Sequence, residues 1–124
     1  MNNLLAIALG GALGSVARYL SSVGVHRMAG RALPWGTLSV NVVGSLLIGI
    51  AFVWFTERSV ANPLWRNFVM IGLLGGFTTF SSFSLETLNL IQEGAALRAL
   101  GNVLLSVSLC IAACGLGIWA GRQL

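Results

Sequence analysis

Charged side chains divide the sequence into four long uncharged runs, at residues 1–17, 32–56, 67–85 and 99–121. A helix that crosses a bilayer needs about 20 apolar residues, so each run is close to one crossing in length. The first run lacks a basic start and a small-residue cleavage pattern, so it is expected to persist as a helix. The pattern predicts an all-α membrane protein whose single domain, 1–124, holds helices over approximately 3–24, 34–55, 66–85 and 99–121.

The third run contains an unusual polar insertion, which reads GLLGGFTTFSSFSLE over residues 72–86. Gly75 and Gly76 each weaken a helix by roughly 1 kcal/mol relative to alanine, and the β-branched Thr78 and Thr79 follow directly. Backbone groups released by a helix break find no partners in lipid, so a break must be buried in protein or line water. Carbonyls of such breaks often coordinate cations in transport proteins. We therefore expect a broken third helix that forms the functional centre.

Composition places the chain in a lipid bilayer. Hydrophobic residues make up 56% of it and charged residues 8%, with a mean hydropathy of +0.89. A soluble domain carries roughly 25% charged residues. The net charge of +4 comes from arginines scattered through short loops, so no nucleic-acid partner is expected.

Small and polar residues recur at helical spacing. Gly10-x-x-x-Gly14 and Gly117-x-x-x-Gly121 are typical of close helix packing. Asn41 and Ser45 lie four apart on one face of the second helix, and Asn102, Ser106 and Cys110 form a weaker stripe on the fourth. An unpaired amide in lipid would cost several kcal/mol, so Asn41 must face protein or water. Packing and a pore lining remain alternative interpretations of these stripes.

Phe80 and Phe83 lie three residues apart among serines and threonines. Phenylalanines at this spacing usually face lipid or a core. Their position beside a helix break favours another role, because the edge of an aromatic ring is positive. Ring edges, hydroxyls and the Asn41 amide would attract a small anion without trapping it, as conduction requires.

The acidic residues argue against two other functions. Glu57, Glu86 and Glu93 are expected at or beyond helix ends, whereas proton-coupled carriers need a carboxylate inside the membrane. A small dual-topology multidrug or cation exporter is the main alternative, yet residues 1–17 hold no glutamate. A non-transporting scaffold is a second alternative. No nucleophile–base pair or metal-ligand cluster is recognisable, so an enzyme is not expected.

Positive charge in short loops normally sets membrane orientation. With four crossings, one side carries Arg58, Arg66 and Arg122. The other side carries Arg27, Arg31 and Arg98. This balance predicts that the chain inserts both ways, and that two copies pair about an axis in the membrane plane.

Three sequence blocks resemble the CrcB/Fluc family of fluoride channels: Gly10-Gly11-x-x-Gly14-x-x-x-Arg18-Tyr19, Trp35-Gly36-Thr37-Leu38-x-Val40-Asn41-x-x-Gly44 and Gly72-x-x-Gly75-Gly76-x-Thr78-Thr79-Phe80-Ser81-x-Phe83. The resemblance covers the first three helices. It implies an antiparallel, dual-topology homodimer in the cell (inner or plasma) membrane. It also implies passive export of fluoride through two pores, which relieves fluoride toxicity.

The resemblance also implies roles for individual residues. Phe80 and Phe83 match the pore phenylalanines, and Asn41 matches the pore amide. Further residues expected along the anion pathway are Ser81, Thr37, Arg18 near a vestibule, and Ser106. For Arg18, contact with headgroups and a place in a wet cavity are equally compatible with the sequence. Backbone carbonyls of Gly75 and Thr78 match the family's structural Na⁺ site.

Overall fold

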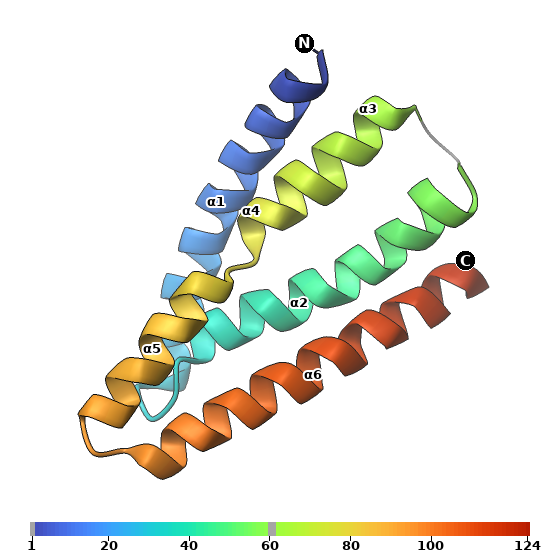
Figure 1. The fold of residues 1–124 in the computed structure, drawn as a ribbon. Coiled ribbons are helices and arrows are strands. Elements are labelled where there is room, and N and C mark those ends of the chain that lie inside the picture. The colour runs from blue at the N-terminus through green and yellow to red at the C-terminus, as the bar shows by residue number, and fades with distance from the viewer. Residues whose placement is uncertain (1, 60–61) are drawn as a thin grey trace.

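The fold is that of a computed structural model, which describes residues 2–59 and 62–124. Within these residues the chain is helical, and four helices are long and apolar enough to cross a membrane. The elements in order are α1 (Asn2–Ala29), α2 (Trp35–Phe52), the π-helix η1 (Val53–Glu57), α3 (Pro63–Arg66), the π-helix η2 (Asn67–Leu74), α4 (Gly75–Phe77), α5 (Phe80–Gln92) and α6 (Ala96–Gln123) (Figure 1). The composite span Pro63–Gln92, from α3 to α5, is called helix 3 below.

The four predicted crossings are confirmed, but three of them are longer than predicted, and α6 begins at Ala96 and ends at Gln123 rather than spanning 99–121. The first helix runs to Ala29 rather than to about residue 24, and helix 3 runs to Gln92 rather than to residue 85. The prediction ended each helix near its charged residues. Long charged side chains instead extend along the helix toward the headgroups while the backbone remains helical.

Local sequence signals mark the helix ends. The Asn62 side chain accepts a hydrogen bond from Leu64 N at 2.9 Å, and Pro63 occupies the first position of α3, where its missing N–H costs nothing. Pro34 directly precedes α2, as predicted for a helix start. Gly30 and Gly94, with φ of 87° and 82°, follow α1 and α5 in the left-handed conformation that terminates helices.

Glycines bring α1 against the first half of helix 3 at backbone contact distance. A Cβ built on Gly72 would lie 2.8 Å from Ile7 O, and one on Gly76 would lie 2.8 Å from Gly11 O. A Cβ on Gly10 would meet Phe68 O, and one on Gly14 would meet Leu73 O. The predicted role of Gly10-x-x-x-Gly14 in helix packing is confirmed.

The pair formed by α2 and α6 uses the same principle. A Cβ on Gly117 would meet Leu46 O, and one on Gly49 would meet Cys114 O. α2 contacts both α1 and α6 and lies between them (Figure 1). Both termini lie at one end of the bundle, and the connections 30–34 and 93–95 lie at the other (Figure 1).

Candidate functional site

The predicted break in helix 3 is confirmed, although it does not fall at the glycine pair. Gly75 is helical, with φ −63° and ψ −38°. The chain becomes extended at Thr78 (φ −89°, ψ 157°) and Thr79 (φ −152°, ψ 113°), and the helix restarts at Phe80. Gly76 serves the close approach to α1 instead, while β-branched threonines suit extended backbone.

The side chain of Asn41 holds the extended residue from α2. Its Oδ1 accepts a hydrogen bond from Thr79 N at 2.7 Å, and its Nδ2 donates to Thr79 O at 3.0 Å. Both main-chain groups of Thr79 are therefore satisfied by one amide. This meets the expectation that Asn41 faces protein or water rather than lipid.

Hydroxyl groups stabilise the two helix ends at the break. Thr78 Oγ1 donates to Leu74 O at 3.0 Å, a carbonyl of the last turn that also accepts from Thr78 N at 3.1 Å. Thr79 Oγ1 accepts from Ser82 N at 3.2 Å and so caps α5. Ser81 Oγ lies 3.2 Å from Thr79 Oγ1. The predicted pathway residue Ser81 thus belongs to the capping cluster and is exposed on the surface of this chain.

Several predicted site residues line one cavity of about 370 Å³ beside the break. They are Asn41, Phe80, Phe83, Ser106, Gly75 and Thr78. The two rings lie with centroids 5.3 Å apart and planes inclined by 47°. Phe83 is buried, whereas Phe80 is 76% exposed. Residues predicted from different helices are therefore brought together, and one ring projects from the surface of the chain.

Arg18 and Thr37 lie in a different cavity, of about 360 Å³, which also includes Thr79 and Ser82. The Arg18 Nε is buried, and no hydrogen-bond partner for it exists among the described residues. Arg18 as a whole is half-buried and lines this cavity, as the cavity interpretation of the sequence requires. Thr79 borders this cavity, and Thr78 and Asn41 border the cavity of the phenylalanines.

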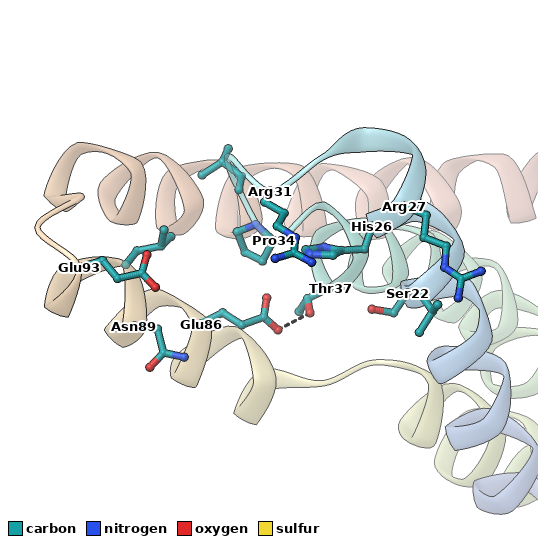
Figure 2. Close-up of a pocket in the computed structure, with 12 residues that line it drawn as sticks. Ser22, His26, Arg27, Arg31, Pro34, Thr37, Glu86, Asn89 and Glu93 are labelled. Carbon is teal, nitrogen blue, oxygen red and sulfur yellow. Dashed lines mark hydrogen bonds between the residues drawn. The ribbon is translucent and has the colours of Figure 1, made fainter.

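A wider cavity of about 750 Å³ opens near the connection 30–34. Figure 2 shows His26 and Arg31 on one side of it and Glu86 on the other. Thr37 Oγ1 donates to Glu86 Oε1 at 2.6 Å. Thr37 and Glu86 also line the cavity of Arg18, so the two cavities share a wall.

The expectation that Glu86 ends helix 3 is wrong. The residue lies within α5, which continues to Gln92, and it is half-buried. The prediction treated the carboxylate as too polar for a membrane helix. A wide polar cavity and a hydroxyl donor supply the solvation that lipid would not.

Sequence reasoning missed a polar contact between α5 and α6. Asn102 is only 1% exposed, and its Nδ2 donates to Thr87 Oγ1 at 2.9 Å. Ser106 Oγ lies 3.5 Å from Asn102 Oδ1, and Thr87 Oγ1 donates to Phe83 O at 2.7 Å. Of the weak stripe on the fourth helix, Asn102 thus serves packing, and Ser106 also reaches the cavity of the phenylalanines. The spacing of 102 and 106 was visible, but nothing in the sequence indicated Thr87 as the partner.

An ion pair joins the ends of α2–η1 and α6 at the other side of the bundle. Arg122 Nη2 lies 2.7 Å from Glu57 Oε2, and Arg122 Nε lies 3.0 Å from Oε1. Arg58 Nη2 donates to Arg122 O at 3.0 Å. Arg58 and Arg122, which were counted above in the charge balance between the two sides, therefore also connect α6 to the end of the second span.

Comparison with known proteins gives a consistent result. Residues 5–118 match the family model described as CrcB-like protein, Camphor Resistance (CrcB). A protein of Coxiella burnetii (strain Dugway 5J108-111) named fluoride-specific ion channel FluC is 54% identical over 123 residues, covering 98% of this chain and 99% of that protein. Proteins of the same name from Magnetococcus marinus and Geobacter sulfurreducens are 53% and 50% identical, over 94% and 100% of this chain and the same shares of their own lengths.

Proposed function

The chain belongs to the CrcB family, and on that basis we propose that it is a fluoride-selective channel through which fluoride leaves the cell passively. It is a multi-pass membrane protein. We place it in the cell (inner or plasma) membrane, where passive export would lower fluoride toxicity. Such conduction requires a pathway rather than catalytic groups.

The observation that carries this proposal is the cavity that Asn41, Phe80, Phe83 and Ser106 line beside the helix break. Its described lining contains no charged side chain. Ring edges, an amide and a hydroxyl would attract a dehydrating anion, and no fixed positive charge would hold it. Selectivity for fluoride over other anions rests on the relatives' names, because these groups are suited to small anions in general.

We propose that Arg18 and Thr37 serve the approach to this cavity. Their cavity lies between the wide opening lined by His26 and Arg31 and the extended Thr79. The half-buried Arg18 would raise the local anion concentration before the uncharged section begins. Ser81, which is exposed beside Phe80, would join the pathway where another copy covers this surface.

A second copy in the opposite orientation is the proposed partner. Phe80 is 76% exposed at the edge of an open cavity, so one chain provides only part of an enclosed pathway. In the most apolar 18-residue stretch of each span, only 11% to 33% is buried within the chain. Large apolar faces are therefore left for lipid and for a partner. The balanced arginines support insertion in both orientations.

Carbonyls of Gly75 and Thr78 are the proposed ligands of a structural Na⁺. Both residues line the cavity at the break, and neither carbonyl accepts a hydrogen bond from α5 within the described residues. No group of three or more His, Cys, Asp or Glu side chains gathers in the described ranges, so main-chain oxygens are the suitable hard donors. When bound, Na⁺ would balance the partial negative charge of these carbonyls.

Ion efflux from liposomes that contain the purified protein tests the function. A fluoride electrode should record rapid release from fluoride-loaded vesicles without a proton gradient, and chloride-loaded vesicles should release little. Proton-coupled movement of organic cations would instead favour a multidrug exporter. Absence of both activities in a correctly assembled protein would favour a scaffold.

A further inference from the structure

The contact between Asn41 and Thr79 uses both polar atoms of the half-buried side-chain amide. Oδ1 and Nδ2 bind the N–H and the C=O of the same residue, at 2.7 and 3.0 Å. A neighbouring strand would hold an extended residue in the same manner, through paired main-chain groups. We propose that Asn41 is a positioning residue that keeps Thr79 extended and thereby keeps the Gly75 carbonyl open for a cation.

The argument follows from hydrogen bonds that an unbroken helix would make. In an α-helix the N–H of residue i donates to the carbonyl of residue i−4. In such a helix Thr79 N would donate to Gly75 O, and Ser82 N would donate to Thr78 O. Asn41 Oδ1 takes the first donor and Thr79 Oγ1 takes the second, at 3.2 Å. The two carbonyls proposed as Na⁺ ligands are those whose helical donors are taken by side chains.

These two hydrogen bonds come from different parts of the chain, and only the one to Thr79 N depends on another helix. Thr79 Oγ1 is part of the restarting helix itself, as an ordinary N-cap. Asn41 belongs to α2, 38 residues away in the chain. The position of α2 therefore controls whether the Gly75 carbonyl remains available, whereas the Thr78 carbonyl is kept open locally.

Residue chemistry restricts what can replace Asn41 in this role. Asparagine offers both an acceptor and a donor on one planar group. Aspartate of the same shape accepts from Thr79 N but cannot donate to Thr79 O, and leucine does neither. An amide has two N–H donors, and only one is required by Thr79. A role for Asn41 on the anion pathway is therefore compatible with this positioning role.

The experiment is solid-state NMR of the full-length protein in lipid bilayers, with ¹³C,¹⁵N-labelled threonine. In the wild-type protein the Thr79 Cα and Cβ shifts should be those of extended backbone. In Asn41→Leu they should move toward helical or averaged values. Ser45→Ala is the matched control, because Ser45 lines the same cavity from the next turn of α2, and it should leave the Thr79 shifts unchanged.

An assembled Asn41→Leu protein with wild-type Thr79 shifts would overturn the inference. If this variant does not assemble, Asn41→Asp provides the same decision. It keeps the acceptor for Thr79 N, so the Thr79 carbonyl shift should change more than the amide nitrogen shift. Unchanged carbonyl and nitrogen shifts in Asn41→Asp would overturn the inference as well.

The link to the cation rests on the proposed function and has its own measurement. The Na⁺ concentration that gives half-maximal thermal stabilisation should rise about fivefold or more in Asn41→Leu, since one hydrogen bond typically changes an equilibrium by about that factor. An unchanged midpoint would overturn the link to the Gly75 carbonyl. A wild-type protein without fluoride flux but with the expected Thr79 shifts would refute the channel and leave the positioning role intact.

Discussion

Phe80 and Phe83 lie in the same cavity but differ in what surrounds them. Phe83 is buried within the chain, so a change there removes packing as well as chemistry. Phe80 is mostly exposed, and little of the fold depends on its ring. Of the two, Phe80 therefore allows the cleaner test of the anion pathway.

Replacing Phe80 by isoleucine should lower fluoride efflux by about tenfold or more, because it removes a positive ring edge and keeps an apolar side chain of similar bulk. The rate is measured with a fluoride electrode on liposomes. Leu85→Ile, at an exposed position on the same helix, is the control and should conduct normally. Wild-type flux in assembled Phe80→Ile would place the ring outside the pathway.

Asn102 illustrates a residue whose effect belongs to packing. Asn102→Leu should lower the free energy of unfolding by about 1–2 kcal/mol, since the hydrogen bond to Thr87 is lost and the half-buried Thr87 hydroxyl loses one partner. Steric trapping or mild denaturation in bilayers measures this change. Ser108→Leu, at an exposed position on the same helix, should have almost no effect. Equal stability of the two variants would contradict the importance of this contact.

At the scale of elements, the glycine contacts between α1 and helix 3 determine how closely the break approaches its neighbours. Gly14 faces the carbonyl of Leu73, so a methyl group there would force the backbones apart. Gly24 on the same helix has nothing within 4 Å of a built Cβ. The same substitution therefore has opposite expected effects at two positions of one helix.

Gly14→Ala should destabilise the protein by several kcal/mol or prevent assembly, because displaced backbones lose many packing contacts. Gly24→Ala should be neutral or stabilising by up to about 1 kcal/mol, since alanine is the better helix former. Thermal unfolding in detergent, followed by size-exclusion chromatography, measures both variants. A Gly14→Ala protein as stable as Gly24→Ala would contradict the close backbone approach.

The elements also show how far the sequence could predict the fold. Four crossings and a broken third helix follow from uncharged runs and from the inserted hydroxyl residues. The location of the break at Thr78–Thr79 could not be predicted, because Gly75 and Gly76 are weaker helix formers than the threonines. The packing of Gly76 against α1, which requires a glycine, is not visible in the sequence. The partners of Asn41 and Asn102 depend on how distant helices cross, which spacing within one helix does not report. Glu86 was misplaced because its solvating cavity is formed by residues from three helices.

At the scale of the whole molecule, the charge balance carries the proposal for two oppositely oriented copies. Loops 30–34 and 93–95 lie at one end of the bundle and the termini at the other (Figure 1). The arginines are shared almost evenly between these ends. Small changes in loop charge should therefore decide orientation.

Ala32→Lys with Gln92→Lys should favour one orientation, and Asn3→Lys with Gln123→Lys should favour the other; all four positions are exposed. Each double variant expressed alone should lose fluoride efflux, because only copies of one orientation are available. Coexpression of both should restore it. Full activity of either variant alone, with reporter fusions proving a single orientation, would contradict the antiparallel pair.

The bond between Asn41 and the interruption in helix 3 also bears on how the protein enters the membrane. A segment whose main-chain groups are incompletely paired is poorly tolerated by lipid while it waits for a partner. Asn41 precedes Thr79 in the chain, so α2 is synthesised and delivered to the bilayer before helix 3 emerges. The order of the chain thus places the acceptor and donor of Asn41 in the bilayer before Thr79 arrives. In a circular permutant in which helix 3 is synthesised first, Thr79 would enter the bilayer without these partners.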